Sequence, residues 1–388
     1  MSHALVIGAG PAGLMAAEAL ARAGHSVTVA EAMPSPGRKF LMAGKSGLNL
    51  TKSEPLDQFL AAYGPDAAPL TPMLRAFDPT ALQDWATALG QELFTGSTGR
   101  VFPRAMKASP LLRAWLTRLE GAGVTLRRRW RWTGWDGQSV VMDTPEGIQH
   151  LTPDATVLAC GGASWARLGS NGAWADHLPG QVAAFQPANM GVAISWSAHM
   201  QRHLGAPIKG IALRAGKQQS RGEVVITQRG LEGGGLYEVS RAVRDGAPLS
   251  LDLMPDLSAQ ALRDRLARPR GKASVSNHLR KALKWGPEKQ ALLMECARPL
   301  PDDLTSVIKA LPIRHDGPLP MDQAISTAGG LRWDCLNDGL MLQARPGTFA
   351  AGEMLNWEAP TGGYLITACM ATGLWAGQSA SEWLAQQT

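Results

Sequence analysis

The clearest pattern of apolar positions stands at the start of the chain. Residues 4–7 are uniformly apolar, as expected of a parallel strand buried on both faces, and the sequence GAGPAG follows at residues 8–13. Residues 12–23 then have apolar side chains at helical spacing, and a second apolar run, residues 26–30, ends at Glu31. The pattern predicts a strand, a helix and a second, parallel strand.

The glycines of this first unit match a dinucleotide-binding fingerprint, G-x-G-x-x-G. Gly8 allows the tight turn, Gly10 lets the backbone approach a pyrophosphate, and Gly13 lets the helix pack closely on the strand. The helix is predicted to begin at Ala12, directly after Pro11, so its free N–H groups face the phosphates. Glu31, with Ala32 after it, lies where an acidic side chain receives ribose hydroxyls in such folds.

A glycine-rich loop with several cations follows directly, at residues 34–52. Its position predicts that it runs along the bound dinucleotide. Arg38 and Lys39 would neutralise phosphates or hold a negatively charged flavin ring, and we expect Ser46 and Asn49 to contact the cofactor as well. The alternative is a solvated basic loop.

The middle of the first half mixes helical and alternating patterns. Residues 56–94 and 111–119 have helical apolar spacing, whereas residues 123–148 alternate and predict a small antiparallel meander. Within the meander we expect Trp132 to contact the cofactor. The run RRRWR at residues 127–131 predicts an exposed strand face, with a nucleic-acid contact as the alternative. A second apolar strand then ends in Gly161 and Gly162, where the chain returns to the nucleotide domain.

The second half contains an insertion and then a second cofactor corner. Residues 190–253 read as short strands and residues 258–311 as helices, so the region 186–320 is predicted to be an inserted unit for substrate recognition. A strand then ends in Gly352 and Glu353, and a turn with Thr361, Gly362 and Gly363 precedes a long helix that starts at Tyr364.

This second corner distinguishes between the two common dinucleotides. Glu353 is placed to hold a ribityl chain, and the N-terminus of the last helix puts partial positive charge where a reduced flavin would be anionic. No second G-x-G-x-x-G is present for a nicotinamide cofactor. The pattern therefore predicts FAD.

Composition adds bounds on compartment and on chemistry. The 388 residues, 45% hydrophobic and 18% charged, allow two or three domains. The four cysteines are scattered, which argues against a zinc site or a disulfide framework and fits a cytoplasmic protein without a metal. The uncharged stretch 359–381 is too short in its apolar part to span a membrane and predicts a buried core helix. No histidine lies in a catalytic motif, so no catalytic acid or base is predicted.

The positive charge of the chain is concentrated in one segment. The net charge is +6, and residues 263–289 alone have nine Lys or Arg against two acids. Together with Trp285, this segment forms a candidate electrostatic footprint for RNA. A solvated helical face is the alternative.

Five stretches together resemble the bacterial BaiN/RdsA-like (YhiN-like) flavoproteins, a family of NAD(P)/FAD-dependent oxidoreductases. They are GAGPAGLMAAEALARAGHSVTVAE (8–31), GRKFLMAGKSGLNLT (37–51), GRVFPRAMKA (99–108), STAGGLRWDCLNDGLMLQARPGTFAAGE (326–353) and PTGGY (360–364). The resemblance implies an α/β fold: a Rossmann-like, glutathione-reductase-like FAD domain (1–185 and 321–388), interrupted by a β-barrel-like domain (186–255) and a small basic helical domain (256–320).

The resemblance also implies particular FAD contacts. These are Gly8, Gly10, Gly13, Glu31, Arg38, Lys39, Gly162, Gly352, Glu353, Gly362, Gly363 and Tyr364. FAD is expected to be non-covalent, with NADH or NADPH as a transient electron donor.

Three functions follow from the sequence and the resemblance. The first is an FAD-dependent oxidoreductase that transfers hydride to or from a small molecule, through amine oxidation or reduction of an activated double bond. The second, an activity of the family, is an RNA-modifying flavoenzyme that reduces uridine to dihydrouridine. The third is a non-catalytic FAD-binding protein.

Overall fold

A computed structural model describes residues 2–45 and 47–387 of the chain. Its contacts divide the chain into two compact units: residues up to Gln186 together with those from Ser326 onward, and Pro187–Ile325 between them. The sequence suggested four parts, with a further boundary at residue 255 inside the second unit. That finer division stays a prediction.

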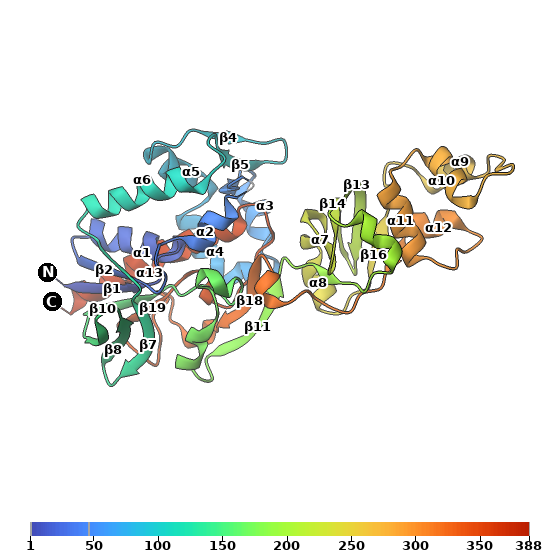
Figure 1. Cartoon of the computed structure of the whole chain (residues 1–388). Helices are drawn as coiled ribbons and strands as arrows, with labels where there is room; N and C mark the ends of the chain where they lie inside the picture. Colours follow the sequence, from blue (N-terminus) through green and yellow to red (C-terminus); the bar gives the residue numbers. More distant parts are fainter. Residues whose placement is uncertain (1, 46, 388) are drawn as a thin grey trace. The chain divides into compact units, whose positions relative to one another are not determined.

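A five-stranded parallel sheet forms the centre of the first unit (Figure 1). Its strand order is β19-β10-β1-β2-β6, and all neighbours pair in parallel. The strands are β1 (His3–Ile7), β2 (Ser26–Glu31), β6 (Thr125–Arg128), β10 (Ala155–Leu158) and β19 (Thr348–Ala350). The predicted meander is therefore wrong at its start, because β6 joins this sheet. Only β7 (Arg131–Asp136), β8 (Ser139–Thr144) and β9 (Gly147–Leu151) form the antiparallel sheet.

Two helices pack on each other beside the sheet, α1 (Pro11–Arg22) and α13 (Tyr364–Gln386). Their close approach depends on glycine: a Cβ on Gly373 would lie 2.2 Å from the Ala12 carbonyl oxygen, and one on Gly377 would lie 2.7 Å from the Ala16 carbonyl oxygen. The uncharged stretch is thus a buried helix, as predicted. Within residues 2–45 and 47–387, no helix is long and apolar enough to cross a membrane.

A buried glutamate joins α1 to two other helices, α5 (Pro79–Ala88) and α6 (Ala108–Gly121). Glu18, 3% exposed, accepts hydrogen bonds from the indole nitrogens of Trp85 (3.2 Å) and Trp115 (2.7 Å) and from Arg118 (3.1 Å), and it pairs with Arg22. Since a buried carboxylate is tolerated only when it is paired and hydrogen-bonded, these donors stabilise the ion inside the core.

The remaining elements of the first unit surround the sheet. A three-stranded sheet has the order β3-β5-β4, and β11 pairs with β18. The elements are α2 (Arg38–Ala43), β3 (Thr51–Lys52), α3 (Leu56–Ala61), α4 (Ala67–Ala76), β4 (Leu93–Thr95), β5 (Arg100–Pro103), the 3₁₀ helices η2 (Ala166–Leu168) and η3 (Ala173–His177), β11 (Val182–Ala188) and β18 (Ser326–Leu331).

The second unit has its own core, built from a six-stranded antiparallel sheet and short helices. The strand order is β12-β15-β14-β13-β16-β17. The elements are β12 (Val192–Ala193), β13 (Pro207–Ala215), β14 (Gln218–Thr227), β15 (Gly230–Glu232), α7 (Gly234–Tyr237), α8 (Ser240–Arg244), β16 (Leu249–Asp252), α9 (Ala259–Leu266), α10 (Val275–Leu283), α11 (Pro287–Cys296), α12 (Leu304–Lys309) and β17 (Leu311–Ile313).

Candidate cofactor-binding site

A cavity of about 320 Å³ lies at the carboxyl edge of the parallel sheet, where β1, β2, β10 and β19 end. From β1 the chain continues on one side to β2, whereas β10 lies on the other side, so the strand order reverses here. Such a reversal is where open α/β sheets bind their ligands. The volume lies within the ~300–1,000 Å³ typical of small-molecule pockets.

The three fingerprint glycines have different reasons to be glycine. A Cβ on Gly8 would lie 2.2 Å from the Ala159 carbonyl oxygen, and one on Gly13 would lie 1.9 Å from the Gly8 carbonyl oxygen. Both positions are therefore fixed by packing of the protein on itself. A Cβ on Gly10 would meet nothing within 4 Å, and Gly10 lines the cavity. The space above Gly10 is thus available to a ligand.

The N-terminus of α1 faces this cavity and carries no internal cap. Its N-cap residue, Gly10, makes no side-chain hydrogen bond, and the first turn has no acidic residue. Pro11 and Ala12 line the cavity beside it. Free helix N–H groups with the positive end of the helix dipole attract phosphate, which fits the predicted pyrophosphate.

Glu31 fixes the turn on the other side of the cavity. Its Oε2 accepts a hydrogen bond from the Ala9 amide (3.1 Å) and its Oε1 accepts one from the Met33 amide (2.8 Å). Burial raises the pKa of Glu31, while the hydrogen bonds from Met33 and Ala9 and the charge of Arg38 oppose that rise. Each carboxylate oxygen has a further lone pair, so ribose hydroxyls can still be accepted.

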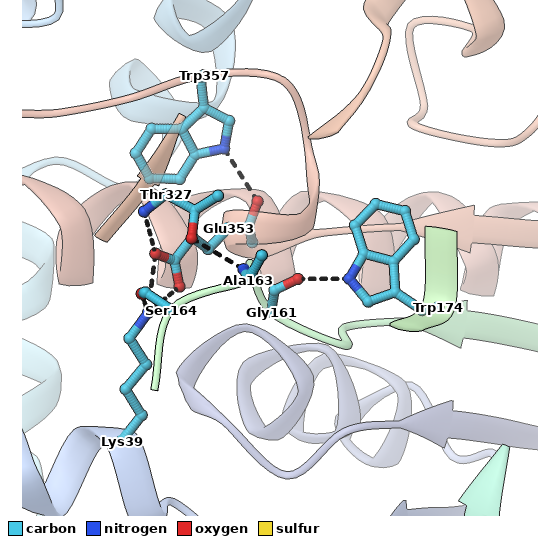
Figure 2. Close-up of polar contacts among 9 residues, drawn as sticks. Lys39, Gly161, Ala163, Ser164, Trp174, Thr327, Glu353 and Trp357 are labelled. Carbon is cyan, nitrogen blue, oxygen red and sulfur yellow. Dashed lines mark hydrogen bonds and ion pairs between the residues drawn. The ribbon is translucent and has the colours of Figure 1, made fainter. Parts of the chain in front are cut away.

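Lys39 and Glu353, which both line the cavity, form a buried ion pair (Figure 2). The ammonium lies 2.9 Å from Oε1 and 2.7 Å from Oε2 of Glu353, and it also donates to the hydroxyl of Ser164 at 2.8 Å. The side chain of Glu353 is 7% exposed and that of Lys39 is 24% exposed. Lys39 therefore binds another side chain of the site instead of standing as a free cation.

Thr327 connects this ion pair to the strand that returns from the inserted unit. Its amide donates to Glu353 Oε1 at 3.0 Å, and its hydroxyl accepts from the Ala163 amide at 2.8 Å (Figure 2). A Cβ on Gly162 would lie 2.5 Å from the Thr327 hydroxyl oxygen, so Gly162 is needed for this contact. Gly352 is held by Trp357, whose indole N–H donates to its carbonyl at 2.9 Å.

Aromatic side chains form another wall of the cavity. Trp132 lines it and contacts the ring of His177 at 4.9 Å between centroids, while its indole nitrogen donates to the Gly134 carbonyl at 2.8 Å. Trp174 donates to the Gly161 carbonyl at 2.8 Å (Figure 2). Flat faces of this kind suit a heterocyclic base.

Two thiols line the cavity as well. Burial raises the pKa of Cys160 to about 12, and burial also raises that of Cys369. A thiol of such high pKa is a poor nucleophile, which fits non-covalent FAD. Across the described residues, no group of three His, Cys, Asp or Glu side chains is arranged to hold a metal ion.

The part of the second predicted corner at residues 361–364 lies outside the residues that line this cavity, whereas Gly352 and Glu353 line it. Gly363 packs on Thr51, since a Cβ there would lie 2.4 Å from the Thr51 Cα. The hydroxyl of Tyr364 donates to Glu54 at 2.5 Å and accepts from Lys52 at 3.0 Å. Burial raises the pKa of Tyr364 to about 12, with Glu54 adding to the rise. The N-terminus of α13 has no side-chain cap and no acid in its first turn.

The predicted contacts thus fall into three groups. Lining the cavity are Gly8, Gly10, Pro11, Ala12, Glu31, Ala32, Arg38, Lys39, Trp132, Gly161, Gly352 and Glu353. Gly13 and Gly162 pack beneath it, and Asn49, Thr361, Gly362, Gly363 and Tyr364 lie elsewhere in the first unit. Ser46 lies outside the described residues. The sequence analysis assigned no role to Ser164, Ser170 or Thr327, although Thr327 lies in a stretch that carries the family resemblance, residues 326–353.

Comparison with known proteins agrees with this description. The family described as HI0933-like protein Rossmann domain matches residues 2–379. A 3-dehydro-bile acid delta(4,6)-reductase from Clostridium scindens is 25% identical over 98% of this chain and 100% of its own length.

Solved structures share the fold at low identity. A flavocytochrome c3 fumarate reductase has a TM-score of 0.55 at 16% identity, over 99% of this chain and 78% of its own. A 3-ketosteroid-delta4-(5alpha)-dehydrogenase from Rhodococcus jostii has a TM-score of 0.52 at 18% identity, over 99% of this chain and 97% of its own. At these identities the likeness concerns the fold alone.

Fold, cavity and relatives define the class of protein as an FAD-dependent oxidoreductase with a Rossmann-like domain that acts on a small molecule. More specifically, the chain belongs to the HI0933-like family, in agreement with the resemblance drawn from its sequence. The predicted non-catalytic alternative is not needed, since the chain is an oxidoreductase.

Proposed function

We propose that this chain reduces a carbon–carbon double bond conjugated to a carbonyl group in a small molecule, with NADH or NADPH as the electron donor. The observation that carries the proposal is the cavity at the strand-order reversal. There the open space above Gly10, the uncapped N-terminus of α1 and the Glu31 carboxylate fit the phosphates and ribose of a dinucleotide.

Bound FAD, once reduced by NADH or NADPH, would supply a hydride to one carbon of the double bond, and a proton from water would go to the other carbon. The residues of the chain would hold and polarise the reactants: α1 binds the pyrophosphate, Glu31 accepts ribose hydroxyls, and Glu353 accepts a hydroxyl of the ribityl chain. These roles of individual residues are part of the proposal.

The region around Lys52, Arg100 and the N-terminus of α13 suits negative charge that develops during the reaction. Lys52 and Arg100 lie directly opposite each other on β3 and β5, and Arg100 Nε is 3.8 Å from the position of a Cβ on Gly362, at the start of α13. Lys52 pairs with Glu54, whereas Arg100 has no ion-pair partner among the described residues. Like charges opposite each other cost stability, so an anionic flavin ring or carbonyl oxygen would be favoured here.

The substrate class rests on the Clostridium scindens relative, whose name describes reduction of a delta(4,6) bond in a 3-dehydro-bile acid. Its match extends over 98% of this chain and 100% of the relative, which supports a related reaction here. Amine oxidation is the alternative that the same chemistry permits.

The experiment is anaerobic turnover of the purified chain with NADH or NADPH and a conjugated ketone, compared with aerobic assays on amines. The proposal expects nucleotide oxidation to depend on the ketone, with a saturated product. Release of hydrogen peroxide with amines, and no reaction with the ketone, would refute it.

RNA as substrate receives less support from the structure. Trp285 is 8% exposed and its indole nitrogen donates to Gln290 at 3.0 Å, so its ring is not free for stacking on a base. Lys289 donates to the carbonyls of Gly210 (3.1 Å) and Leu253 (2.8 Å), a structural role within the second unit. The other cations of residues 263–289 remain on the surface for a salt-dependent RNA-binding test.

We also propose a reducing compartment, the cytoplasm, because all four cysteines are free thiols.

A further inference from the structure

A hydroxyl group in the wall of the cavity has no partner. Ser170 is 6% exposed and lines the cavity, and its Oγ is buried without a hydrogen bond among the described residues. A buried hydroxyl without a partner has lost its hydrogen bonds to water and gained none in return, so such groups are rare in folded proteins. A ligand atom that received this hydrogen bond would remove the cost.

The surrounding backbone fixes where the hydroxyl lies. Gly169 and Gly172 on either side have φ of +102° and +71°, a left-handed conformation that favours glycine. A Cβ on Gly161 would lie 3.3 Å from Ser170 Oγ, and a Cβ on Gly169 would lie 2.8 Å from Met33 Cγ. Ser170 is therefore held between the end of β10 and the residue whose amide binds Glu31.

A second donor that lines the same cavity is also unpartnered. Arg38 Nε is buried without a hydrogen bond, although its Nη1 donates to Ser35 at 3.4 Å. By contrast, Ser164 is fully buried and receives a hydrogen bond from Lys39. The Ser164 hydroxyl at the Lys39–Glu353 ion pair is thus satisfied within the protein, whereas Ser170 Oγ and Arg38 Nε are not.

We propose that Ser170 Oγ donates a hydrogen bond to an oxygen of the adenosine diphosphate half of FAD, with Arg38 Nε as a second donor to the same half. The position beside Gly161 and Met33, next to the ribose-binding carboxylate of Glu31, sets the half of the cofactor. Ser170 is a binding residue, assigned by geometry because no sequence motif marks it. The proposal rests on the cavity holding FAD.

The test is Ser170→Ala in the full chain, with FAD, ADP and FMN as separate probes. Loss of one hydrogen bond to a bound oxygen is expected to weaken FAD and ADP about tenfold, equivalent to 1.4 kcal/mol, and to leave FMN unchanged. Urea unfolding of the FAD-stripped chain gives a second readout. Since the substitution removes an unpartnered buried hydroxyl, the unfolding midpoint should stay or rise.

Ser164→Ala is the matched control. It removes a partnered hydroxyl and should lower the unfolding midpoint of the stripped chain. If Ser170→Ala lowers the midpoint in the same way, or leaves FAD and ADP affinity unchanged, the proposal is wrong. Ser170→Cys, of similar size and with a weak donor, repeats the test should the alanine variant not fold.

The unaltered chain is measured in the same series. If it binds neither FAD nor ADP, both the proposed function and this proposal fail. If it binds both and Ser170→Ala does too with equal affinity, this proposal alone fails.

Discussion

The buried pair of Lys39 and Glu353 allows a quantitative prediction. Glu353→Gln removes the negative charge but keeps an oxygen that accepts from the Thr327 amide and the Lys39 ammonium. Breaking a buried ion pair from one side costs ~3–5 kcal/mol, because the other charge is left uncompensated. Since the Lys39 side chain is 24% exposed and can be partly rehydrated, we expect a loss just below this range, about 2–3 kcal/mol in the free energy of unfolding.

The converse change, Lys39→Met, leaves the Glu353 carboxylate with the Thr327 amide as its remaining hydrogen-bond donor among the described residues. Glu353 is 7% exposed, so the expected loss is larger, about 3–4 kcal/mol. The double variant, Lys39→Met with Glu353→Gln, leaves no charge at this pair. Its loss of unfolding free energy should be smaller than the sum of the two single losses by about 1–3 kcal/mol.

The assay is urea unfolding of the FAD-stripped chain followed by tryptophan fluorescence, because bound FAD would add a stabilisation that changes with the affinity of each variant. The exposed pair Lys209 and Glu223, 3.8 Å apart and with side chains 73% and 48% exposed, is the matched control. For Lys209 and Glu223, the unfolding free energy lost in the double variant should equal the sum of the single losses. Additive effects of the Lys39 and Glu353 variants would refute the reasoning that they form a coupled buried pair.

Three further predictions concern the cofactor site. Gly10→Ala should fold normally and bind FAD at least tenfold more weakly, whereas Gly13→Ala should lower the unfolding midpoint, as urea unfolding and FAD titration would show. Arg100→Gln should lower the flavin reduction potential by removing a cation near α13, and the exposed Arg104→Gln should leave the potential unchanged. Because burial raises the pKa of Glu31 above its ordinary 4.5, the folded chain keeps this proton where the unfolded chain has lost it. The free energy of unfolding therefore falls as the pH rises through the raised pKa of Glu31. In Glu31→Gln this pH dependence should be weaker, as urea unfolding at a series of pH values would show.

The beginning of the fold was predictable because its signals are local. One strand, one helix, a second strand and Glu31 follow each other within residues 3–31, and apolar spacing plus glycine positions are sufficient to place them. The fingerprint also gave the position of the cavity, since the carboxyl ends of parallel strands share one edge.

Other parts of the fold and of the site depend on contacts between residues far apart in the sequence. The spacing of apolar residues along the chain does not reveal such contacts. Lys39 and Glu353 are separated by 314 positions, and Ala163 and Thr327 by 164. The pairing of β6 with β2 was missed because the sequence of β6 continues without a break into the alternating pattern of the meander. The unpartnered hydroxyl of Ser170 is visible only once the neighbours of each atom are known.

The central claim is that the cavity at the carboxyl ends of β1, β2, β10 and β19 holds FAD. The most direct measurement is the FAD content of the purified chain, from the flavin spectrum before and after denaturation, for the unaltered protein and for Gly10→Leu. The account predicts one FAD per unaltered chain, released intact on denaturation, and a folded Gly10→Leu variant without flavin. A colourless unaltered protein that takes up no FAD, or full FAD content in Gly10→Leu, would contradict it.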